Sequence, residues 1–450
     1  MISAPEIAIA QAAPVAPRRK LNVLVVTGSY SPDSTGMAPL NAEMCEYLAA
    51  RGHRVTVGTC FPHYPEWRIQ DSYRGRLWTR ETRGGVTIHR RWIWVPERRA
   101  PLRRIAYDTS VGIAAGLGGI AAGRPDIVLG ISPPLQGALA AWAIARNHGV
   151  PFVLQIKDLV PDIAIALGML RNRVAIRAAR SLEHFIYRRA DRILVICEGF
   201  RQAVRAAGIP DGSIAVVPDW VDTDFVSPAA AGAKFRCAHG LLKRKVLLHS
   251  GNMGAKQKLD TVLEAAARLE GISDLVICLA GEGSEKSRLQ ALAANRGLKN
   301  VRFLPLAPRA ELPNMLAAAD LLLLCQSAAI RDVVAPSKLL TYLASGRTVI
   351  AAASSTSETA RTVLESGGGV VVAPEDPAAL AETIAIFSAR PEQLREFGFR
   401  GRRFAERNFS SKEVLARIET ELVSCVAGPD GRSSSSTPRP TVQRAATAAR

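Results

Sequence analysis

Residues 21–27 read Leu-Asn-Val-Leu-Val-Val-Thr, a run of mostly β-branched side chains that is typical of a buried parallel strand. A glycine-containing loop follows at 28–36, and residues 38–51 then carry apolar side chains at helical spacing. Residues 54–59 are again rich in β-branched side chains. Strand, glycine loop, helix and strand form one βαβ unit, which predicts a parallel sheet with right-handed crossovers.

The same alternation continues on both sides of a Pro/Ala/Gly-rich linker at residues 227–234. Before the linker, strands are predicted at 126–131, 151–157, 191–197 and 214–218, and after it at 245–250, 275–280, 301–304, 321–325, 349–352 and 369–372. The pattern predicts an α/β protein with two Rossmann-like, doubly wound domains that face each other across a cleft. The expected parts are a disordered leader at 1–19, a first domain at 20–230, a second domain at 235–390, a C-terminal helical segment at 391–427 and a disordered tail at 428–450. The helical segment at 391–427 is considered as a crossing back to the first domain.

Composition limits the kinds of partner. The chain has 450 residues, which is too many for one compact core, and a net charge of +18 that suits nucleic acid, an anionic membrane surface or phosphorylated substrates. The seven cysteines have no metal-ligand spacing and favour free thiols in a reducing cytoplasm. No apolar run is long enough to span a membrane, and no secretory signal precedes the first strand. A cytoplasmic location is therefore predicted.

Glycines and lysines follow the strands of the second domain. Gly251 to Lys258 follow one strand, and Gly281-Glu282-Gly283 follow the next. Further on, Ser337 suits a helix N-cap and Lys338 then lies in the first turn, where the helix dipole favours anions rather than cations. A lysine beside exposed N–H groups is explained if both bind one anion, such as a diphosphate. The alternative is a surface lysine on an ordinary capped helix.

The first domain offers two loops at strand ends. Gly36 lies in the loop after the first strand, and Asp158 directly follows the strand predicted at 151–157. Asp158 could face the cleft; the alternative is a helix N-cap or a loop carboxylate that pairs with Lys157. The Asp-Thr-Asp sequence at 222–224 is interpreted as a turn rather than a metal site.

Residues 89–104 combine arginines with tryptophans, beginning His-Arg-Arg-Trp-Ile-Trp. This composition suits a membrane interface with anionic lipids. Residues 105–123 continue with small apolar side chains, a segment that we take to be too short and too interrupted by glycine to span a bilayer. The alternative is a basic strand followed by a core helix.

Taken together, these motifs resemble the retaining glycosyltransferases of family 4, which have the GT-B fold, and within them the bacterial exopolysaccharide branch that includes the colanic acid transferases. The likeness covers about residues 20–425. It is carried by Gly-Ser-Tyr-Ser-Pro-Asp-Ser-Thr-Gly (28–36), Ser-Pro-Pro-Leu (132–135), Lys-Asp-Leu-Val-Pro-Asp (157–162), Val-Pro-Asp-Trp-Val-Asp-Thr (217–223), Ser-Gly-Asn-Met-Gly (250–254), Ala-Gly-Glu-Gly (280–283) and Ala-Pro-Ser-Lys-Leu-Leu-Thr-Tyr-Leu-Ala-Ser-Gly (335–346).

The resemblance implies that the second domain holds a nucleotide-diphosphate sugar and that the first domain faces the acceptor and the membrane. The residues implied for catalysis are Asp158, Lys338 and Lys256, and those for donor binding are Gly36, Gly251, Asn252, Gly254, Glu282, Gly283, Pro336, Ser337, Lys338 and Thr341. No metal and no cofactor are implied. The chain departs from the family where Val333 and Thr341 replace two glutamates, the second of which normally holds the ribose, and where Gln257 takes the commonest lysine position.

The expected activity is transfer of a sugar, with retention and without metal, to a saccharide or polyprenyl-diphosphate-linked acceptor in exopolysaccharide biosynthesis. The enzyme is expected at the inner face of the cell membrane, as a peripheral protein. Two alternatives are a nucleotide-sugar 2-epimerase of the same architecture and a non-catalytic nucleotide-sugar binder. Nucleic-acid binding is disfavoured because two doubly wound halves do not match the known RNA- and DNA-reading modules.

Overall fold

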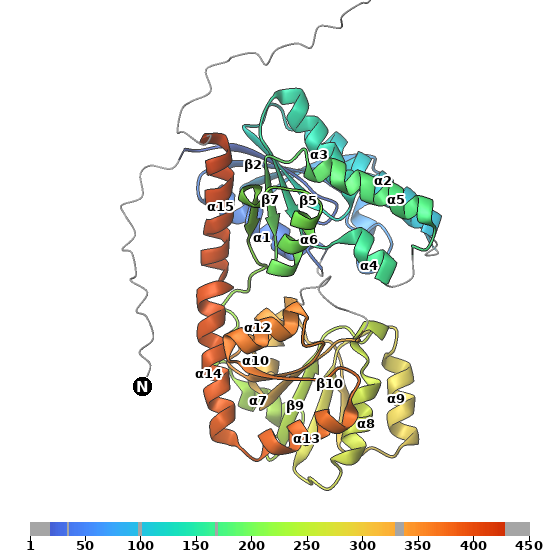
Figure 1. Cartoon of the computed structure of the whole chain (residues 1–450), viewed down its shortest axis with the longest axis vertical. Helices are drawn as coiled ribbons and strands as arrows, with labels where there is room; N and C mark the ends of the chain where they lie inside the picture. Colours follow the sequence, from blue (N-terminus) through green and yellow to red (C-terminus); the bar gives the residue numbers. More distant parts are fainter. Residues whose placement is uncertain (1–18, 34–35, 98–100, 167–169, 329–336, 428–450) are drawn as a thin grey trace, which may run out of the picture.

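The computed structural model describes residues 19–33, 36–97, 101–166, 170–328 and 337–427. They form two lobes stacked end to end, each built around one sheet with helices on both faces (Figure 1). The first lobe contains eight strands in the order β3-β4-β2-β1-β5-β6-β7-β8, and the second contains six in the order β11-β10-β9-β12-β13-β14. The predicted architecture of two doubly wound α/β domains is confirmed. The predicted leader and tail lie outside the described residues, apart from Arg19.

The strands of the first lobe are mutually parallel apart from one edge hairpin. Their bounds are β1 Asn22–Val26, β2 Arg54–Cys60, β3 Trp78–Arg83, β4 Val86–Arg91, β5 Ile127–Ser132, β6 Phe152–Ile156, β7 Arg192–Val195 and β8 Ile214–Val216. The hairpin of β3 and β4 was not predicted, because its charged side chains do not show a clean alternation. One of them, Arg90, is only 1% exposed and pairs with Glu81 on the neighbouring strand (Nε to Oε1, 3.1 Å).

The helices of the first lobe are α1 Ala38–Ala50, α2 Pro101–Ile120, α3 Leu135–His148, α4 Val160–Ala166, α5 Arg173–Tyr187 and α6 Glu198–Ala206, with short 3-10 turns at Asp71–Tyr73 and Asp211–Ser213. α2 is one continuous helix to Ile120, so glycine does not interrupt it, and the alternative of a basic strand followed by a packed helix describes this region. Its glycines instead permit close packing: a Cβ on Gly118 would lie 2.6 Å from the carbonyl oxygen of His89, and one on Gly112 would clash with Gln136 of α3.

All strand pairings in the second lobe are parallel. Its strands are β9 Lys245–Ser250, β10 Leu275–Ala280, β11 Val301–Leu304, β12 Leu321–Cys325, β13 Thr348–Ala352 and β14 Gly369–Val372. Its helices are α7 Gly232–Ala238, α8 Asp260–Arg268, α9 Lys286–Asn295, α10 Leu312–Ala317, α11 Ser337–Ala344, α12 Glu358–Ser366 and α13 Pro377–Ser388, with 3-10 turns η3 Ala255–Gln257 and η4 Arg309–Glu311. Buried aliphatic side chains fill both faces of each sheet, which gives each lobe a core of its own.

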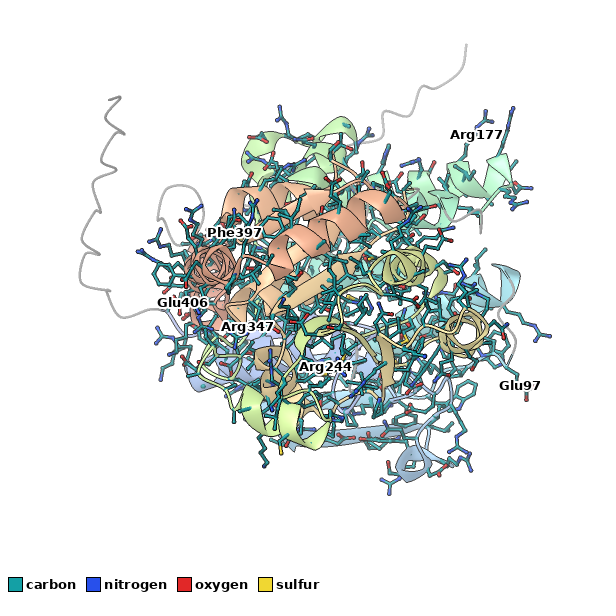
Figure 2. All side chains as sticks on the ribbon, turned by 90° about the horizontal axis from the view of Figure 1, so that it is seen from below. Glu97, Arg177, Arg244, Arg347, Phe397 and Glu406 are labelled. Atoms are coloured by element: carbon teal, nitrogen blue, oxygen red, sulfur yellow. The ribbon has the colours of Figure 1, made fainter. Side chains whose placement is uncertain are left out.

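The chain crosses between the lobes twice, and the two crossings lie side by side. In the first, Val221 donates its N–H to the carbonyl of Phe409 (2.8 Å) and accepts from the N–H of Ser411 (3.0 Å). In the second, α14 (Pro391–Asn408) packs on the second lobe and α15 (Ser411–Ala427) runs along the first (Figure 1). In the orthogonal view, Phe397 and Glu406 of α14 lie on one side of the molecule and Arg177 of α5 on the other (Figure 2).

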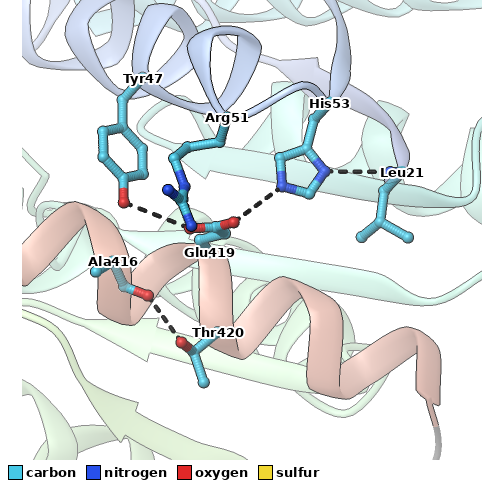
Figure 3. A network of polar contacts seen from close by, with 7 residues as sticks. All are labelled: Leu21, Tyr47, Arg51, His53, Ala416, Glu419 and Thr420. Atoms are coloured by element: carbon cyan, nitrogen blue, oxygen red, sulfur yellow. Dashed lines mark hydrogen bonds and ion pairs between the residues drawn. The ribbon is translucent and has the colours of Figure 1, made fainter. Parts of the chain in front are cut away.

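A buried carboxylate fastens α15 to the first lobe (Figure 3). Glu419 is 1% exposed and lies within 3.4 Å of the hydroxyl of Tyr47, 3.3 Å of Arg51 Nε and 3.3 Å of His53 Nε2. Because the backbone N–H of Leu21 donates to His53 Nδ1 (3.1 Å), the neutral ring carries its proton on Nε2 and donates it to Glu419. This network fixes the second crossing against the first strand.

Candidate active site

The two sheets direct the carboxyl ends of their strands toward the junction between the lobes, where parallel α/β sheets bind ligands. In the second lobe, the loops after β9 and β10 pack backbone against backbone. Gly251 donates its N–H to the carbonyl of Ala280 (2.8 Å), and Met253 donates to that of Glu282 (2.8 Å). A Cβ on Gly281 would lie 1.9 Å from the oxygen of Gly251, so only glycine permits this approach.

Lys338 reaches this pair of loops from the second position of α11. Its ammonium is buried and has no hydrogen-bond partner among the described residues. It lies against the first glycine of the β9 loop, because a Cβ on Gly251 would stand 3.0 Å from Nζ. Burial lowers the pKa of Lys338 to about 8. A buried cation without a counter-charge beside a glycine loop is arranged to receive an anion.

Two residues that the sequence did not single out support this loop. Tyr342, buried on α11, accepts a hydrogen bond from the N–H of Ser250 (2.8 Å) and donates one to its carbonyl (3.2 Å). His249, which is fully buried in β9, lies close to Lys338; burial and then Lys338 lower its pKa to about 3. The histidine is therefore neutral and donates through Nδ1 to the carbonyl of Leu323 (3.2 Å). Because His249 lies in a buried strand and Tyr342 in an apolar helix, the sequence pattern predicts only that both residues belong to the hydrophobic core.

Asp158 of the first lobe and Lys256 of the second act on each other across the junction. Burial raises the pKa of Asp158 to about 6, Lys256 opposes the rise, Asp219 adds to it and Lys157 opposes it. Neither alternative for Asp158 holds: α4 begins two residues later, with Leu159 accepting its first backbone hydrogen bond (3.0 Å from Ile163 N), and Lys157 forms its ion pair with Asp219. Asp158 is thus a carboxyl group that titrates near neutrality at the lobe junction.

The other predicted donor residues lie around these loops. Gly254 donates its N–H to Gln257 Oε1 (3.1 Å), with the side chain of Asn252 beside it. Glu282 forms an exposed ion pair with Lys286 (2.6 Å), on the side of the loop that leads into α9. Gly283 packs on the backbone of the β9 loop, since a Cβ there would stand 2.3 Å from the oxygen of Met253.

The remaining predicted donor residues flank α11 or belong to the first lobe. The helix begins at Ser337, so the predicted N-cap is its first helical residue, and Thr341 lies one turn further on and is partly exposed. Gly36 adopts a left-handed backbone (φ +67°) next to Tyr64 in the first lobe. Pro336 and Val333 lie outside the described residues.

The Asp-Thr-Asp sequence forms the predicted turn. Asp222 Oδ1 accepts the N–H groups of Asp224 (3.0 Å) and Phe225 (2.9 Å), while Asp224 pairs with Lys412 (3.0 Å). Within the described ranges, no three His, Cys, Asp or Glu side chains gather as metal ligands would.

Comparison with known proteins assigns the class. The chain matches a family model described as "Glycosyl transferase 4-like domain" over residues 35–220 and one described as "Glycosyl transferases group 1" over residues 234–404. The protein belongs to the glycosyltransferases and is an enzyme of that class.

Among curated relatives, the chain is similar to the Escherichia coli (strain K12) protein named "Putative colanic acid biosynthesis glycosyl transferase WcaI", with 29% identity over 410 residues, 89% of this chain and 100% of WcaI. It is also similar to a GDP-mannose-dependent alpha-(1-6)-phosphatidylinositol monomannoside mannosyltransferase of Mycolicibacterium smegmatis, with 26% identity over 89% of this chain and 98% of that protein.

Solved structures confirm the GT-B architecture. Alr3699/HepE from Anabaena, solved in complex with UDP, superposes with a TM-score of 0.66 at 15% identity, over 89% of this chain and 99% of that one. The lipopolysaccharide glycosyltransferase WaaG superposes with a TM-score of 0.64 at 17% identity, over 89% and 99%. Sucrose-phosphate synthase from Thermosynechococcus elongatus gives 0.70 at 16% identity, over 90% and 98%.

Proposed function

We propose that this glycosyltransferase takes a sugar from a nucleotide-diphosphate sugar and transfers it to a lipid-linked saccharide in cell-surface polysaccharide biosynthesis. The observation that carries the proposal is the buried ammonium of Lys338, which lies against Gly251 with no counter-charge among the described residues. A diphosphate supplies that charge. HepE, a structural neighbour, binds UDP and UDP-glucose, and the WcaI relative is named for colanic acid biosynthesis.

In this proposal the leaving diphosphate is neutralised by protein groups rather than by a metal ion. Lys338 and the first N–H groups of α11 contact one end of it, and the exposed Lys256, whose charge also acts on Asp158, supplies a second cation. Fixed cations and helix N–H groups stabilise charge that develops on a departing phosphate. Departure of the diphosphate leaves an electron-poor sugar carbon, and attack from the same face gives retention of configuration.

Asp158 is proposed to orient the acceptor hydroxyl and accept its proton. With a pKa of about 6, the carboxylate is ionised at neutral pH and basic enough to accept a proton as the new bond forms. Its position in the first lobe, near Lys256 of the second, supports a role toward the acceptor.

An apolar stripe on the first lobe supports a membrane-bound acceptor. One face of α2 packs on the sheet and on α3, while the opposite face carries exposed aliphatic side chains at helical spacing. Those side chains, each between 49 and 64% exposed, are Ile105, Ile113, Leu117 and Ile120. Exposed Trp78, Trp92 and Trp94 lie on the neighbouring hairpin and the segment that leaves it.

Basic residues accompany this stripe. Arg103 is exposed near the start of α2, and Arg177 of α5 projects from the periphery of the same lobe (Figure 2). Tryptophan, aliphatic and arginine side chains on one lobe suit the interface of an anionic bilayer. No helix in the described part of the chain is long and apolar enough to cross a membrane. We therefore propose a peripheral protein at the cytoplasmic face of the cell membrane.

The nucleotide proposal is tested by thermal denaturation with UDP, GDP, UDP-glucose and GDP-mannose. A ligand at one hundred times its dissociation constant stabilises the folded protein by about 2.7 kcal/mol. We expect one base to raise the melting temperature and the other not. If no nucleotide changes it at millimolar concentration, the proposal is wrong.

The membrane proposal is tested by flotation with vesicles that contain anionic lipid. Ile113→Glu combined with Leu117→Glu is expected to abolish flotation at low salt, because two charges then replace the centre of the stripe. Leu364→Glu, at an exposed leucine of α12 in the second lobe, is the matched control and should float like wild type. Equal flotation of all three proteins would rule out this surface.

The sequence leaves two alternatives: a nucleotide-sugar 2-epimerase, because it shares this architecture, and a non-catalytic binder, because Val333 and Thr341 replace two family glutamates. Incubation with UDP-N-acetylglucosamine alone separates them. Conversion of the sugar without acceptor would indicate the epimerase, and nucleotide binding without conversion or transfer would indicate the binder.

A further inference from the structure

The buried cation next to Asp158 does not pair with Asp158. Lys157 ends β6, is 3% exposed, and makes its ion pair with Asp219, a residue 62 positions further along the chain. Its ammonium also stands 4.8 Å from the ring centroid of the buried Trp220. Asp219 and Trp220 lie just after β8, in the segment at residues 219–231 that crosses between the lobes and ends in the predicted Pro/Ala/Gly-rich stretch; this whole segment is called the linker below. The strand end that carries the proposed proton acceptor is thus fastened to the linker.

The linker also contacts the second crossing between the lobes. Val221 forms the backbone hydrogen bonds to Phe409 and Ser411 that join the two crossings. Asp219 lines a small crevice between the lobes, of about 40 Å³, together with Ser337 at the start of α11. Asp219 is therefore bound to the strand end at Lys157 and lines the same crevice as the first residue of the helix that carries Lys338.

We propose that the Lys157–Asp219 ion pair is a positioning pair for the reaction. It keeps the lysine next to Asp158 occupied, and it attaches the strand end that carries Asp158 to the linker. The inference rests on the role proposed above for Asp158. Without Asp219, the carboxylate left for the Lys157 ammonium within the described residues is that of its neighbour, and Asp158 becomes a structural ion-pair partner. Without Lys157, Asp219 is an uncompensated anion beside Asp158.

The charged groups that act on Asp158 are few and their effects have opposite signs. They are Lys256 from η3, Asp219 from the linker and Lys157 from β6. Asp162 of α4 is paired with Arg180 of α5 (2.6 Å). Removing the charge of Asp219 should lower the pKa of Asp158, and removing that of Lys157 should raise it. A charge within about 4–6 Å of a carboxylate shifts its pKa by about one unit or more.

The test compares Asp219→Asn, Lys157→Met and the double variant. The pKa of Asp158 is followed in the full chain without ligand, by ¹³C NMR of labelled aspartate side chains, with the resonance assigned through Asp158→Asn. We expect the pKa to move down by about one unit in Asp219→Asn, up by about one unit in Lys157→Met, and little in the double variant. Asp224→Asn, which removes an exposed ion pair to Lys412 on the same linker, is the matched control and should change nothing.

The same shifts should appear in the acid limb of kcat/KM for nucleotide release from the nucleotide sugar that stabilises the protein. If the pair had only a structural role, both single variants would have a lower melting temperature. The acid limb of kcat/KM would then stay at the same pH in both variants, or would move in the same direction in both. Either result would overturn the inference. If no nucleotide sugar binds, the proposed function fails, while the ligand-free NMR titration still decides whether the pair sets the state of Asp158.

Discussion

Lys338→Met should make the empty protein more stable and, at the same time, remove its response to nucleotide. Methionine keeps the length and the apolar stem of lysine and omits the charge. In the ligand-free protein the ammonium is buried among His249, Cys325 and Gly251, and no carboxylate among the described residues balances it. The cation therefore destabilises the empty fold at neutral pH, and a bound anion would offset that destabilisation.

The size of this destabilisation follows from the pKa of Lys338, which falls from an ordinary 10.5 to about 8. That difference means that the charged form of Lys338 destabilises the folded state by about 3 kcal/mol relative to the unfolded chain. At pH 7 the lysine is protonated in both the folded and the unfolded chain, so the whole penalty applies. As the pH rises from about 8 toward 10.5 the folded lysine loses its proton first and the penalty disappears. The stabilising effect of Lys338→Met should be largest below pH 8 and should shrink above it.

A gain of 1 kcal/mol raises the melting temperature of a domain of this size by about 2–4 °C. Differential scanning calorimetry at pH 7 and pH 10, with and without the nucleotide that binds wild type, measures both effects. We expect a higher melting temperature for the empty variant at pH 7, a smaller difference at pH 10, and at least a hundredfold loss of nucleotide affinity. Lys299→Met, at an exposed lysine of the same lobe, should change neither quantity. A variant that is no more stable than wild type when empty, and still binds nucleotide, would refute the role of Lys338.

Three further changes test other parts of the junction and its support. Gly281→Ala should abolish nucleotide-induced stabilisation, because its Cβ would lie 1.9 Å from the oxygen of Gly251. Gly271→Ala, whose Cβ would have nothing within 4 Å, should leave it unchanged. Isothermal titration compares the nucleotide affinities of the two variants. Asp158→Asn should reduce turnover by about 10²- to 10⁴-fold and keep nucleotide binding, and wild-type turnover should rise as the pH passes the pKa of about 6. Glu419→Ala leaves buried hydrogen-bond partners unsatisfied and should lower the free energy of unfolding by about 1–3 kcal/mol, as measured by urea unfolding. Hydrogen exchange along α15 should be faster, and unchanged exchange there would contradict the role of Glu419 in holding α15.

Local chemistry in the sequence was enough to predict most strands. Runs such as residues 321–325 are apolar on both faces because helices cover both sides of the sheet, and that pattern needs no knowledge of distant residues. The glycine loops and Lys338 were found in the same way, since each directly follows or precedes such an element. The hairpin of β3 and β4 was missed because Arg90 is buried by pairing with Glu81, and an ion pair across strands leaves no periodic signal.

Long-range pairing limited the prediction of the site. Asp158 was identified from its place after a strand, but its electrostatic surroundings depend on Lys256, about one hundred residues away in the sequence. They also depend on Asp219, which forms an ion pair with the neighbouring Lys157. Likewise, nothing local distinguishes His249 from any other residue of a buried strand, although its neutral ring lies beside the ammonium of Lys338. Only the fold brings these groups together.

Backbone strain marks the same edge of both sheets. Among the described residues, three residues other than glycine have a positive φ: Trp67, Lys258 and Glu375. Trp67 lies in the loop after β2, and the other two follow β9 and β14 and meet in an ion pair of 3.9 Å. Glu375 also accepts hydrogen bonds from the hydroxyl of Ser327 (3.1 Å) and the N–H of Ala328 (3.0 Å), just after β12. Left-handed conformations of such residues persist only where surrounding contacts hold them, and they gather at binding sites. Their common position at strand ends is thus independent support, from backbone geometry alone, for placing the chemistry at the junction of the lobes.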